Sequence, residues 1–295
     1  MLIPLVYAFS TSGQITTDSK YPGLFNGSLK LSILDSLPVG DLLIAGNIKI
    51  TQAQLDSEIK KASASLQPQL KDNLFFLLES VAIDRLLNAE VRDWAVSKKI
   101  NTKNMKDQDV IKKYVEELTT NITVSADEVK KAYDSDPEVY GGAKFSDAEP
   151  YIKSQLIDEK KQEVVENHVN NLGKRIVIKV NDDWVKAQYP KAIDNLVDKA
   201  RRSGKPSLVD FGASGCRPCD MMAPMLEELK KEYTGIMNIE FVDVRERQIL
   251  GARYGVSSIP VQVFFDKDGK EFYRHVGFIP KNNILAKLKE MGVSK

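Results

Sequence analysis

Both cysteines of this 295-residue chain stand in one four-residue window, Cys216-Arg217-Pro218-Cys219. The window follows an apolar run and opens a segment with helical periodicity. Two cysteines can form at most one disulfide within the chain, so the fold has to depend on hydrophobic cores. A chain of this length can form two such cores. The cysteine chemistry is therefore confined to one point, at the start of a predicted helix.

Charge balance and residue counts exclude several classes of function. The chain has 42 Lys and Arg against 41 Asp and Glu, a net charge of +1, so we expect no nucleic-acid partner. The longest apolar stretch, Leu2–Phe9, has eight residues, whereas a membrane-spanning helix needs about twenty. Only His168 and His275 accompany the cysteines. No four-ligand zinc site is visible, and we expect no metal.

The position of the pair predicts different roles for its two sulfurs. Two cysteines three positions apart at a helix start can close a small disulfide, with only the first exposed. Free amides and the helix dipole would stabilise a Cys216 thiolate, so we expect Cys216 to be the nucleophile and Cys219 the resolving thiol. Arg217 adds a charge that favours the thiolate, and Pro218 fixes the backbone between the sulfurs. A redox-active disulfide of this kind needs no other cofactor.

The pattern along the chain changes near residue 181. We expect a two-domain α+β protein, with a mainly helical domain over residues 31–180 and an α/β domain with a mixed sheet over residues 181–295. Residues 1–30 are expected to form a flexible leader. Its apolar stretch, Leu2–Phe9, is either a truncated secretion signal or an apolar tail, since no lysine or arginine precedes it.

Local signals in the first domain predict several helices. Gly46-Asn47 predicts a hairpin, after which Thr51 caps a helix to about residue 62. The apolar spacing over residues 70–96 predicts one long helix. Capping boxes are predicted where Ser125 precedes Glu128 and where Ser146 precedes Glu149. His168 lies on the apolar stripe of the last long helix, where we expect a packed, hydrogen-bonded residue rather than a catalyst.

A C-x-x-C motif alone could be a redox pair or half of a zinc site. The flanking residues decide between these two interpretations. Residues 208–224, LVDFGASGCRPCDMMAP, and residues 254–260, YGVSSIP, stand in the right order. They resemble the active-site region and the second landmark of the thioredoxin family. The resemblance covers residues 181–295 and implies a thioredoxin fold with thiol-disulfide oxidoreductase activity.

The resemblance assigns further roles to residues of this chain. Asp210 matches the family's buried acid, which moves protons for the second cysteine and whose pKa would be raised by desolvation. Pro260 matches the cis-proline beside the disulfide, and the Ile259 backbone would pair with an extended substrate strand. Pro224 matches the proline that kinks the active-site helix.

Three positions depart from the family pattern. Gly212 and Gly215 stand where thioredoxins commonly carry tryptophan, and Phe241 stands where a lysine is often found near the buried acid. Loss of both tryptophans removes a flat hydrophobic surface beside the sulfur, which leaves substrate choice open. We place Gly215 with Ile259 and Pro260 among the residues that face the substrate.

Segments outside these motifs carry two further resemblances. Residues 264–278 are similar to extracytoplasmic thioredoxin-like reductases, such as the C-terminal domains of membrane thiol relays and the proteins of cytochrome c maturation. Residues 46–180 resemble the N-terminal helical module of SurA/PrsA-type foldases. Only residues 135–146 fill the place of the parvulin domain, so we expect no prolyl-isomerase activity. Such a module would cradle extended polypeptide, with Phe75, Phe76 or Trp94 either lining a cleft or filling the helical core, or it would form a homodimer.

Two functions follow from these observations. The first is an extracytoplasmic protein thiol-disulfide oxidoreductase, a reductase by resemblance although Arg217 favours an oxidising couple. Its partners would be protein or peptide thiols and disulfides, with a membrane thiol relay or a thioredoxin system as electron donor. The alternative is a chaperone whose cysteine pair is a redox switch. The resemblances and the signal-like start favour the periplasm, with membrane association if the signal is uncleaved.

Overall fold

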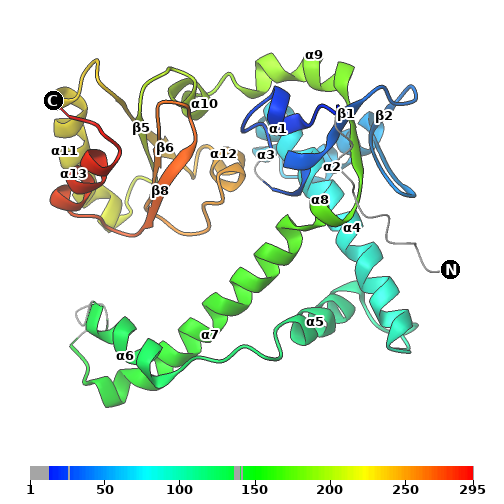
Figure 1. Cartoon of the computed structure of the whole chain (residues 1–295), viewed down its shortest axis with the longest axis horizontal. Coiled ribbons are helices and arrows are strands. Elements are labelled where there is room, and N and C mark those ends of the chain that lie inside the picture. The colour runs from blue at the N-terminus through cyan, green and yellow to red at the C-terminus, as the bar shows by residue number, and fades with distance from the viewer. Residues whose placement is uncertain (1–12, 26, 136–139, 141, 295) are drawn as a thin grey trace. The chain divides into compact units, whose positions relative to one another are not determined.

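A computed structural model describes residues 13–25, 27–135, 140 and 142–294 (Figure 1). The apolar stretch Leu2–Phe9 lies outside the described residues. The described chain divides into two compact units, one formed by Ala82–Val177 and the other by the residues up to Val81 together with those from Ile178 onward. The sequence predicted one boundary near residue 181. In the structure, the described residues up to and including Val81 instead group with the C-terminal half.

The first unit, Ala82–Val177, is helical. It contains the second half of α4 (Leu74–Ser97), α5 (Asp107–Leu118), α6 (Ala126–Ser135), α7 (Phe145–Asn170) and α8 (Leu172–Arg175). Val91 and Ala95 of α4 pack against Val110 and Tyr114 of α5 in one core cluster. A second cluster joins α6 to the start of α7.

Capping signals in this unit give one confirmed prediction and one wrong one. The backbone amide and the hydroxyl of Ser125 donate to Glu128, whose own amide donates to Ser125 Oγ, as predicted. The second capping box is absent, because α7 starts one residue before Ser146 and its N-cap, Lys144, has no side-chain cap bond. A favourable sequence signal is therefore not used when the chain enters the helix earlier.

His168 belongs to a polar cluster inside the helical unit, as predicted for a hydrogen-bonded residue. Its Nε2 lies 3.0 Å from Glu90 Oε2 and 3.2 Å from the Tyr114 hydroxyl. Arg175 Nη1 donates to Glu90 Oε1 at 2.7 Å. Burial raises the pKa of Tyr114 to about 12, and the nearby Glu90 carboxylate adds to this effect. These four residues connect α4, α5, α7 and α8.

The second unit contains two four-stranded sheets. In the first, β1 (Ile33–Asp35) pairs in parallel with β4 (Ile178–Asn181), and β2 (Asp41–Ala45) pairs antiparallel with both β4 and β3 (Ile48–Thr51). The predicted hairpin is confirmed as β2 and β3. Since β4 comes from a distant part of the sequence, this sheet explains why residues before Val81 group with the C-terminal half.

Two helices follow the first hairpin, α2 (Gln52–Lys61) and α3 (Leu66–Asp72), before α4 begins. Thr51 caps α2 with Gln54 as its partner, as predicted. The single helix predicted over residues 70–96 is wrong, because the chain breaks at Asn73, whose side-chain amide donates to the Gln69 carbonyl at 2.8 Å. An asparagine side chain that binds nearby backbone competes with helical hydrogen bonding.

The described part of the predicted flexible leader is ordered. It forms α1 (Thr17–Lys20) and the short 3-10 helix η1 (Ser28–Leu31). Tyr21, Leu24 and Phe25 are buried, and the ring of Phe25 meets that of Phe75 edge-on. The segment is ordered, although its Gly/Ser/Thr-rich composition predicted flexibility, because its few apolar side chains are buried in a neighbouring core.

The second sheet of this unit has the strand order β6-β5-β7-β8 and is mixed, as the predicted fold class requires. The strands are β5 (Ser207–Gly212), β6 (Asn238–Asp243), β7 (Val261–Phe265) and β8 (Glu271–Val276); the helices are α9 (Asp182–Ala192), α10 (Leu196–Arg201), α11 (Arg217–Glu232), α12 (Gln248–Arg253) and α13 (Lys281–Glu290). Strand β6 runs parallel to β5, while β7 and β8 run antiparallel to their neighbours.

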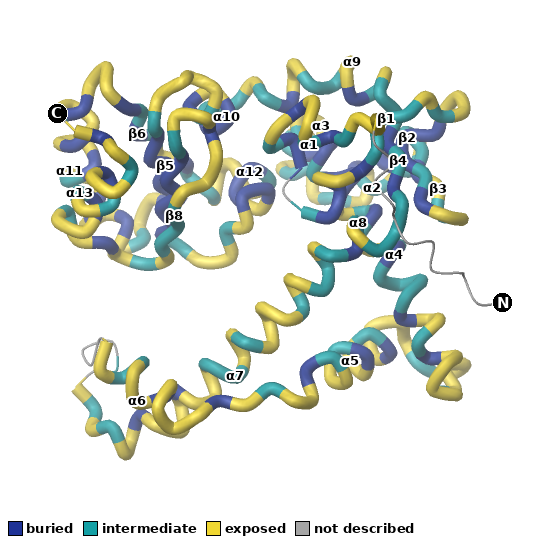
Figure 2. The backbone as a smooth tube through the Cα atoms, in the orientation of Figure 1, coloured by how far each residue is buried: buried dark blue, intermediate teal, exposed yellow. Residues whose placement is uncertain are grey.

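Helices cover both faces of this sheet. Leu208 of β5 packs with Met222 of α11 and Leu288 of α13, whereas Val209 packs with Val197 of α10 and Leu250 of α12. Every residue of β5 and β7 is buried (Figure 2). Alternate residues of β5 therefore face opposite helical layers. Across the described residues, no helix is long and apolar enough to cross a membrane.

Candidate functional site

The cysteine pair lies at the junction of strand β5 and helix α11. Cys216 is the N-cap residue of α11, and Arg217 and Pro218 open its first turn. The two cysteines form a disulfide with a Cα–Cα separation of 5.2 Å. Cys216 is half-buried, whereas Cys219 is only 5% exposed. An incoming sulfur can therefore reach Cys216 more easily than Cys219, and the free amides of the helix start lie beside Cys216.

Gly215 shapes the turn that leads into the helix. Its φ is +74°, a left-handed conformation that side-chain-bearing residues rarely adopt. The next amide, that of Cys216, donates to the Ala213 carbonyl at 3.3 Å. Gly215 is exposed, and Arg217 is exposed two residues further on. Gly215 therefore leaves the approach to Cys216 without a side chain from this position.

Two residues at the end of strand β6 and just beyond it hold the turn in place, and no motif in the sequence singles them out. Asp243 accepts hydrogen bonds from the amide and the hydroxyl of Ser214 at 3.2 and 3.3 Å. Arg245 Nη1 donates to the Ser214 carbonyl at 2.6 Å. Partial burial would raise the pKa of Asp243, but hydrogen bonds from the amides of Arg245 and Ser214 lower it below its usual value. The only signal in the sequence for Asp243 and Arg245 is their position at or just after the end of an apolar strand.

The cis-proline lies at the same end of the sheet as the cysteine turn. The Ile259–Pro260 bond is cis. The next residue, Val261, pairs with Phe211 near the C-terminal end of β5, where the turn begins. Pro260 is buried, and its carbonyl accepts a hydrogen bond from the Gly277 amide at 2.8 Å. Ile259, on the other side of the cis bond, is half-buried.

Asp210 lies inside the sheet and is 1% exposed. Its Oδ1 accepts a hydrogen bond from Gln262 Nε2 at 2.8 Å. Burial raises the pKa of Asp210 to about 6, although the bond from Gln262 acts in the opposite direction. Asp210 and Gly212 face the same side of β5, because they are two residues apart in a strand. A Cβ atom at Gly212 would lie 3.3 Å from Cys219 Sγ, so this side is the one that carries Cys219.

The ring of Phe241, on the neighbouring strand β6, lies beside Gly212. Its position is opposite Asp210 in the register of β5 and β6. A Cβ atom built on Gly212 would lie 2.8 Å from Phe241 Cε2. The side chain is still 48% exposed. Glycines stand at both tryptophan positions, and an aromatic ring nevertheless reaches Gly212 from the neighbouring strand.

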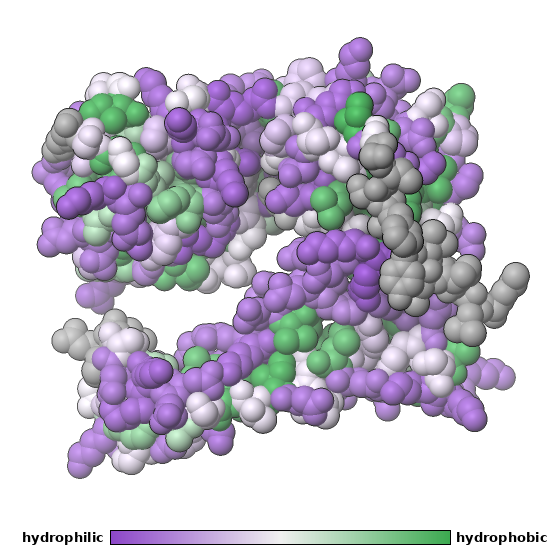
Figure 3. Space-filling model, in the orientation of Figure 1, coloured by the Kyte–Doolittle hydropathy of each residue, from purple (hydrophilic) through white to green (hydrophobic). Residues whose placement is uncertain are grey.

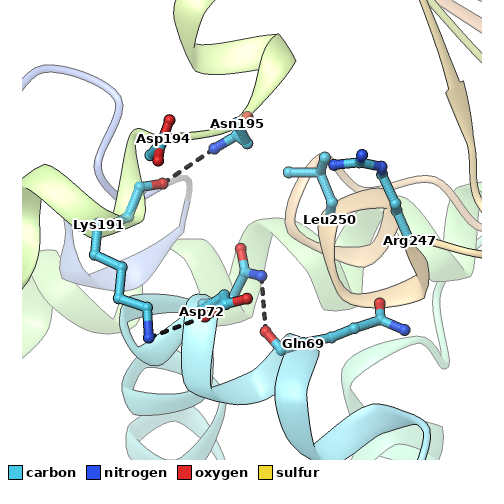
Figure 4. A pocket seen from close by; sticks show the side chains of 9 residues that line it. Gln69, Asp72, Lys191, Asp194, Asn195, Arg247 and Leu250 are labelled. Carbon is cyan, nitrogen blue, oxygen red and sulfur yellow. Dashed lines mark hydrogen bonds and ion pairs between the residues drawn. The ribbon is translucent and has the colours of Figure 1, made fainter.

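A separate cavity of about 230 Å³ lies elsewhere in this unit and contains none of the predicted site residues (Figure 4). It is polar, and its lining includes Gln69, Lys191, Asn195 and Arg247. Lys191 Nζ already pairs with Asp72 Oδ1 at 2.9 Å. Over the ranges that the structure describes, no group of three or more His, Cys, Asp or Glu residues is placed to hold a metal ion.

Comparison with known proteins gives a match that covers the cysteine site. The thioredoxin family model matches residues 185–290. Thioredoxin of Staphylococcus saprophyticus is 45% identical over 100 residues, which is 34% of this chain and 94% of the relative. Thioredoxin of Staphylococcus aureus is 45% identical over 98 residues, 33% of this chain and 92% of the relative. The structure of Fasciola hepatica thioredoxin is 30% identical, covers 36% of this chain and 93% of its own, and has a TM-score of 0.29.

Proposed function

Because the chain belongs to the thioredoxin family and carries a thiol-disulfide oxidoreductase domain over residues 185–290, we propose that it reduces disulfides of other proteins outside the cytoplasmic membrane. One observation carries the proposal. A half-buried Cys216 and a buried Cys219 are joined at the start of a helix, on the side of the sheet that holds the buried Asp210. This arrangement separates an attacking sulfur from a resolving one.

The reaction starts from the reduced pair. The Cys216 thiolate attacks one sulfur of a substrate disulfide, forms a mixed disulfide and releases the first substrate thiolate, which takes a proton from water. Cys219 then gives its proton to the Asp210 carboxylate and attacks Cys216 Sγ. This second attack breaks the mixed disulfide, forms the Cys216–Cys219 disulfide and releases the second substrate sulfur as a thiolate, which takes a proton from water. The substrate gains two electrons and the protein loses two, and an external dithiol restores the reduced pair.

Insulin reduction with dithiothreitol as the electron source tests the proposed activity. The wild type should accelerate turnover, and Cys216→Ser should abolish the acceleration. Cys219→Ser should form a mixed disulfide that does not resolve, which mass spectrometry detects. If Cys216→Ser turns over as fast as the wild type, the proposed function is wrong.

A redox titration against glutathione tests the direction. We propose the reducing direction because residues 264–278 resemble extracytoplasmic reductases, and a single exposed charge at Arg217 changes a potential only modestly. A reductase should have a potential near that of thioredoxin, about −270 mV, rather than near the roughly −120 mV of a strong periplasmic oxidant. A membrane thiol relay or a thioredoxin system would then supply electrons to the protein, without any organic cofactor.

We propose in addition that the helical unit recruits unfolded protein substrates, as the resemblance to SurA/PrsA-type foldases implies. Tyr151 and Val164 of α7 are exposed, at 66% and 36%. Hydrophobic surface is visible where Figure 1 labels α5 and α7 (Figure 3). Phe75 is buried and packs against Phe25, whereas the half-buried Trp94 packs against Tyr114.

Recruitment and redox turnover can be separated in the full chain. Cys216→Ser/Cys219→Ser should still suppress aggregation of a reduced, unfolded client, and the added change Tyr151→Ser/Val164→Ser should weaken that suppression several-fold. Lys153→Ser, on the same helix and also exposed to solvent, is the matched control. If the double serine variant of the cysteines does not suppress aggregation, the helical unit does not recruit clients.

A further inference from the structure

Gln262 is a fully buried amide within a strand of apolar side chains. It lies on β7, and its neighbours along the strand, Val261, Val263 and Phe264, are all buried. Antiparallel pairing puts Gln262 directly opposite Asp210 of β5. Burying an amide is unfavourable unless its hydrogen-bonding groups are satisfied, so a glutamine at a core strand position needs an explanation.

The two ends of the amide differ in how well they are satisfied. Nε2 donates to Asp210 Oδ1 at 2.8 Å and lies 3.4 Å from Met222 Sδ. The carbonyl oxygen Oε1 is buried and has no hydrogen-bond partner among the described residues. Gln262 therefore keeps an unused acceptor next to a carboxyl group that can carry a proton.

Among the groups around Asp210, Gln262 is the one that hydrogen-bonds to the carboxyl and can therefore respond to its protonation state. The residue opposite Asp210 on β6 is Phe241, the one on β7 is Gln262, and α11 contributes Cys219 and Met222 on this side of the sheet. Burial and the bond from Gln262 are the effects that act on the carboxyl, with no charged neighbour among them.

An amide can match both protonation states of a carboxyl group. A carboxylate accepts hydrogen bonds and is satisfied by the N–H groups of the amide, whereas a carboxylic acid also donates and is satisfied by its C=O. Rotation of the terminal amide about its last single bond exchanges these two ends. We propose that Gln262 is a positioning residue that adapts to both protonation states of Asp210 and so allows this buried carboxyl to take the Cys219 proton and release it again.

This inference rests on the proposed reductase function for its place in the reaction. When Cys219 transfers its proton, the Asp210 carboxylate becomes an acid and the amide turns its oxygen toward the new O–H. When Asp210 returns the proton to water, the amide turns back. No bond other than those to the transferred proton is made or broken in this step, and no further reactant is required. An apolar residue in place of Gln262 would leave the carboxylate unpaired and favour the protonated acid.

The titration of Asp210 tests the inference directly. Carbon-13 NMR of labelled aspartate carboxyls in the oxidised full chain should show Asp210 titrating near pH 6. In Gln262→Leu the midpoint should rise by about one pH unit, the usual effect of one hydrogen bond to a charged group. Gln262→Met gives the same apolar replacement with a more adaptable side chain if the leucine variant folds poorly. An unchanged midpoint in the folded variants would overturn the inference.

Matched controls separate this role from a general effect on the strand. Val263→Leu changes the neighbouring position, which packs in the core on the α10 and α12 face of the sheet. It should leave the titration midpoint of Asp210 unchanged. In single-turnover experiments, the pH profile of mixed-disulfide resolution should move upward in Gln262→Leu by the same amount as the titration. In the Asp210→Asn background, Gln262→Leu should produce no further movement of the profile, and a movement there would contradict the inference.

The two proposals can fail separately. If the wild type does not reduce insulin while Gln262→Leu still moves the Asp210 titration, the reductase function is wrong and the pairing of Gln262 with Asp210 stands. If the wild type reduces insulin while the titration stays in place, the function stands and Gln262 has no positioning role.

Discussion

The ring of Phe241 lies where a side chain at Gly212 would have to go. A Cβ atom at Gly212 would come within 2.8 Å of Phe241 Cε2, with Cys219 Sγ also close at 3.3 Å. One residue can therefore be large only if the other is small. The glycine and the phenylalanine act as a pair that places an aromatic ring close to the Cys219 side of β5.

Gly212→Ala should thus be destabilising in the wild type but neutral or stabilising in a Phe241→Ala background. The added methyl group forces the ring away in the first case, at a cost of about 1 kcal/mol. In the second case the methyl group meets only Cys219, whose Cβ and Sγ both lie at 3.3 Å, a close contact that needs a much smaller adjustment than the 2.8 Å contact with Phe241. Urea unfolding of the single and double variants gives the coupling energy. Equal effects in both backgrounds would contradict the pairing.

Asp210→Asn should stabilise the oxidised protein at pH 8 and have little effect at pH 3. The pKa of Asp210 is raised to about 6 from 3.8, so the folded state holds the proton more tightly than the unfolded state. Stability therefore falls as pH rises from about 4 to above 6, by about 3 kcal/mol in total. Urea unfolding across this range measures the gain.

The matched control for this experiment is Asp243→Asn. The pKa of Asp243 is lowered, since backbone hydrogen bonds outweigh the effect of partial burial. Its contribution to stability is present above the unfolded pKa and disappears as pH falls through the lower, folded-state pKa. Asp243→Asn should therefore be destabilising at pH 8, opposite in sign to Asp210→Asn. Equal signs for the two variants would show that the burial of Asp210 does not control its titration.

Arg217→Ala should make the cysteine couple more reducing. Arg217 is exposed in the first turn of α11, where its charge favours the Cys216 thiolate and hence the reduced form. Since an exposed charge contributes little, the shift should be on the order of 10–20 mV. Equilibration with glutathione measures it. Lys231→Ala, in the last turn of the same helix, should leave the potential unchanged.

Arg175→Met should loosen the helical unit without affecting the thioredoxin sheet. The change leaves Glu90 half-buried with one of its partners removed, which should cost about 1–3 kcal/mol. Hydrogen exchange should increase in α5 and α7, while the amides of β5 keep their protection. Lys98→Met breaks an exposed ion pair with Glu117 and should cost less than about 1 kcal/mol.

Acid should weaken the same cluster. Burial raises the pKa of Glu90, but hydrogen bonds from His168 and Arg175 lower it more, so its pKa lies below the usual 4.5. The stabilisation is complete above that value and is lost as pH falls through the lower, folded-state pKa. The protection of the α5 and α7 amides, corrected for the intrinsic exchange rate at each pH, should fall more between pH 6 and pH 3 in the wild type than in Glu90→Gln.

Local signals account for the elements that the sequence predicted well. The β2–β3 hairpin and the Thr51 cap of α2 lie where they were predicted, and α11 starts at the cysteine pair as expected, because turns and helix caps depend on neighbouring residues. The non-local features were missed. Nothing near Ile33 indicates that it pairs with Lys179, and nothing near Gln262 indicates that it faces a carboxyl group. The break at Asn73 was missed because the apolar spacing continues across it.

The site shows the same contrast. The cysteine pair, Asp210 and Pro260 lie in short sequence motifs, so they could be identified without knowledge of the fold. The placement of Phe241 against Gly212 depends on the register of β5 and β6, and the hydrogen bond from Ser214 to Asp243 depends on where the turn after β5 meets the end of β6. Such contacts are set by tertiary structure, so the sequence indicated the chemistry but not the residues that adjust it.

Strand β4 gives the helical unit two points of attachment. The chain leaves the second unit within α4 and returns at Ile178, where β4 pairs with both β1 and β2. A single cut in the helical unit would therefore yield two fragments that remain associated through the β1-β4-β2-β3 sheet.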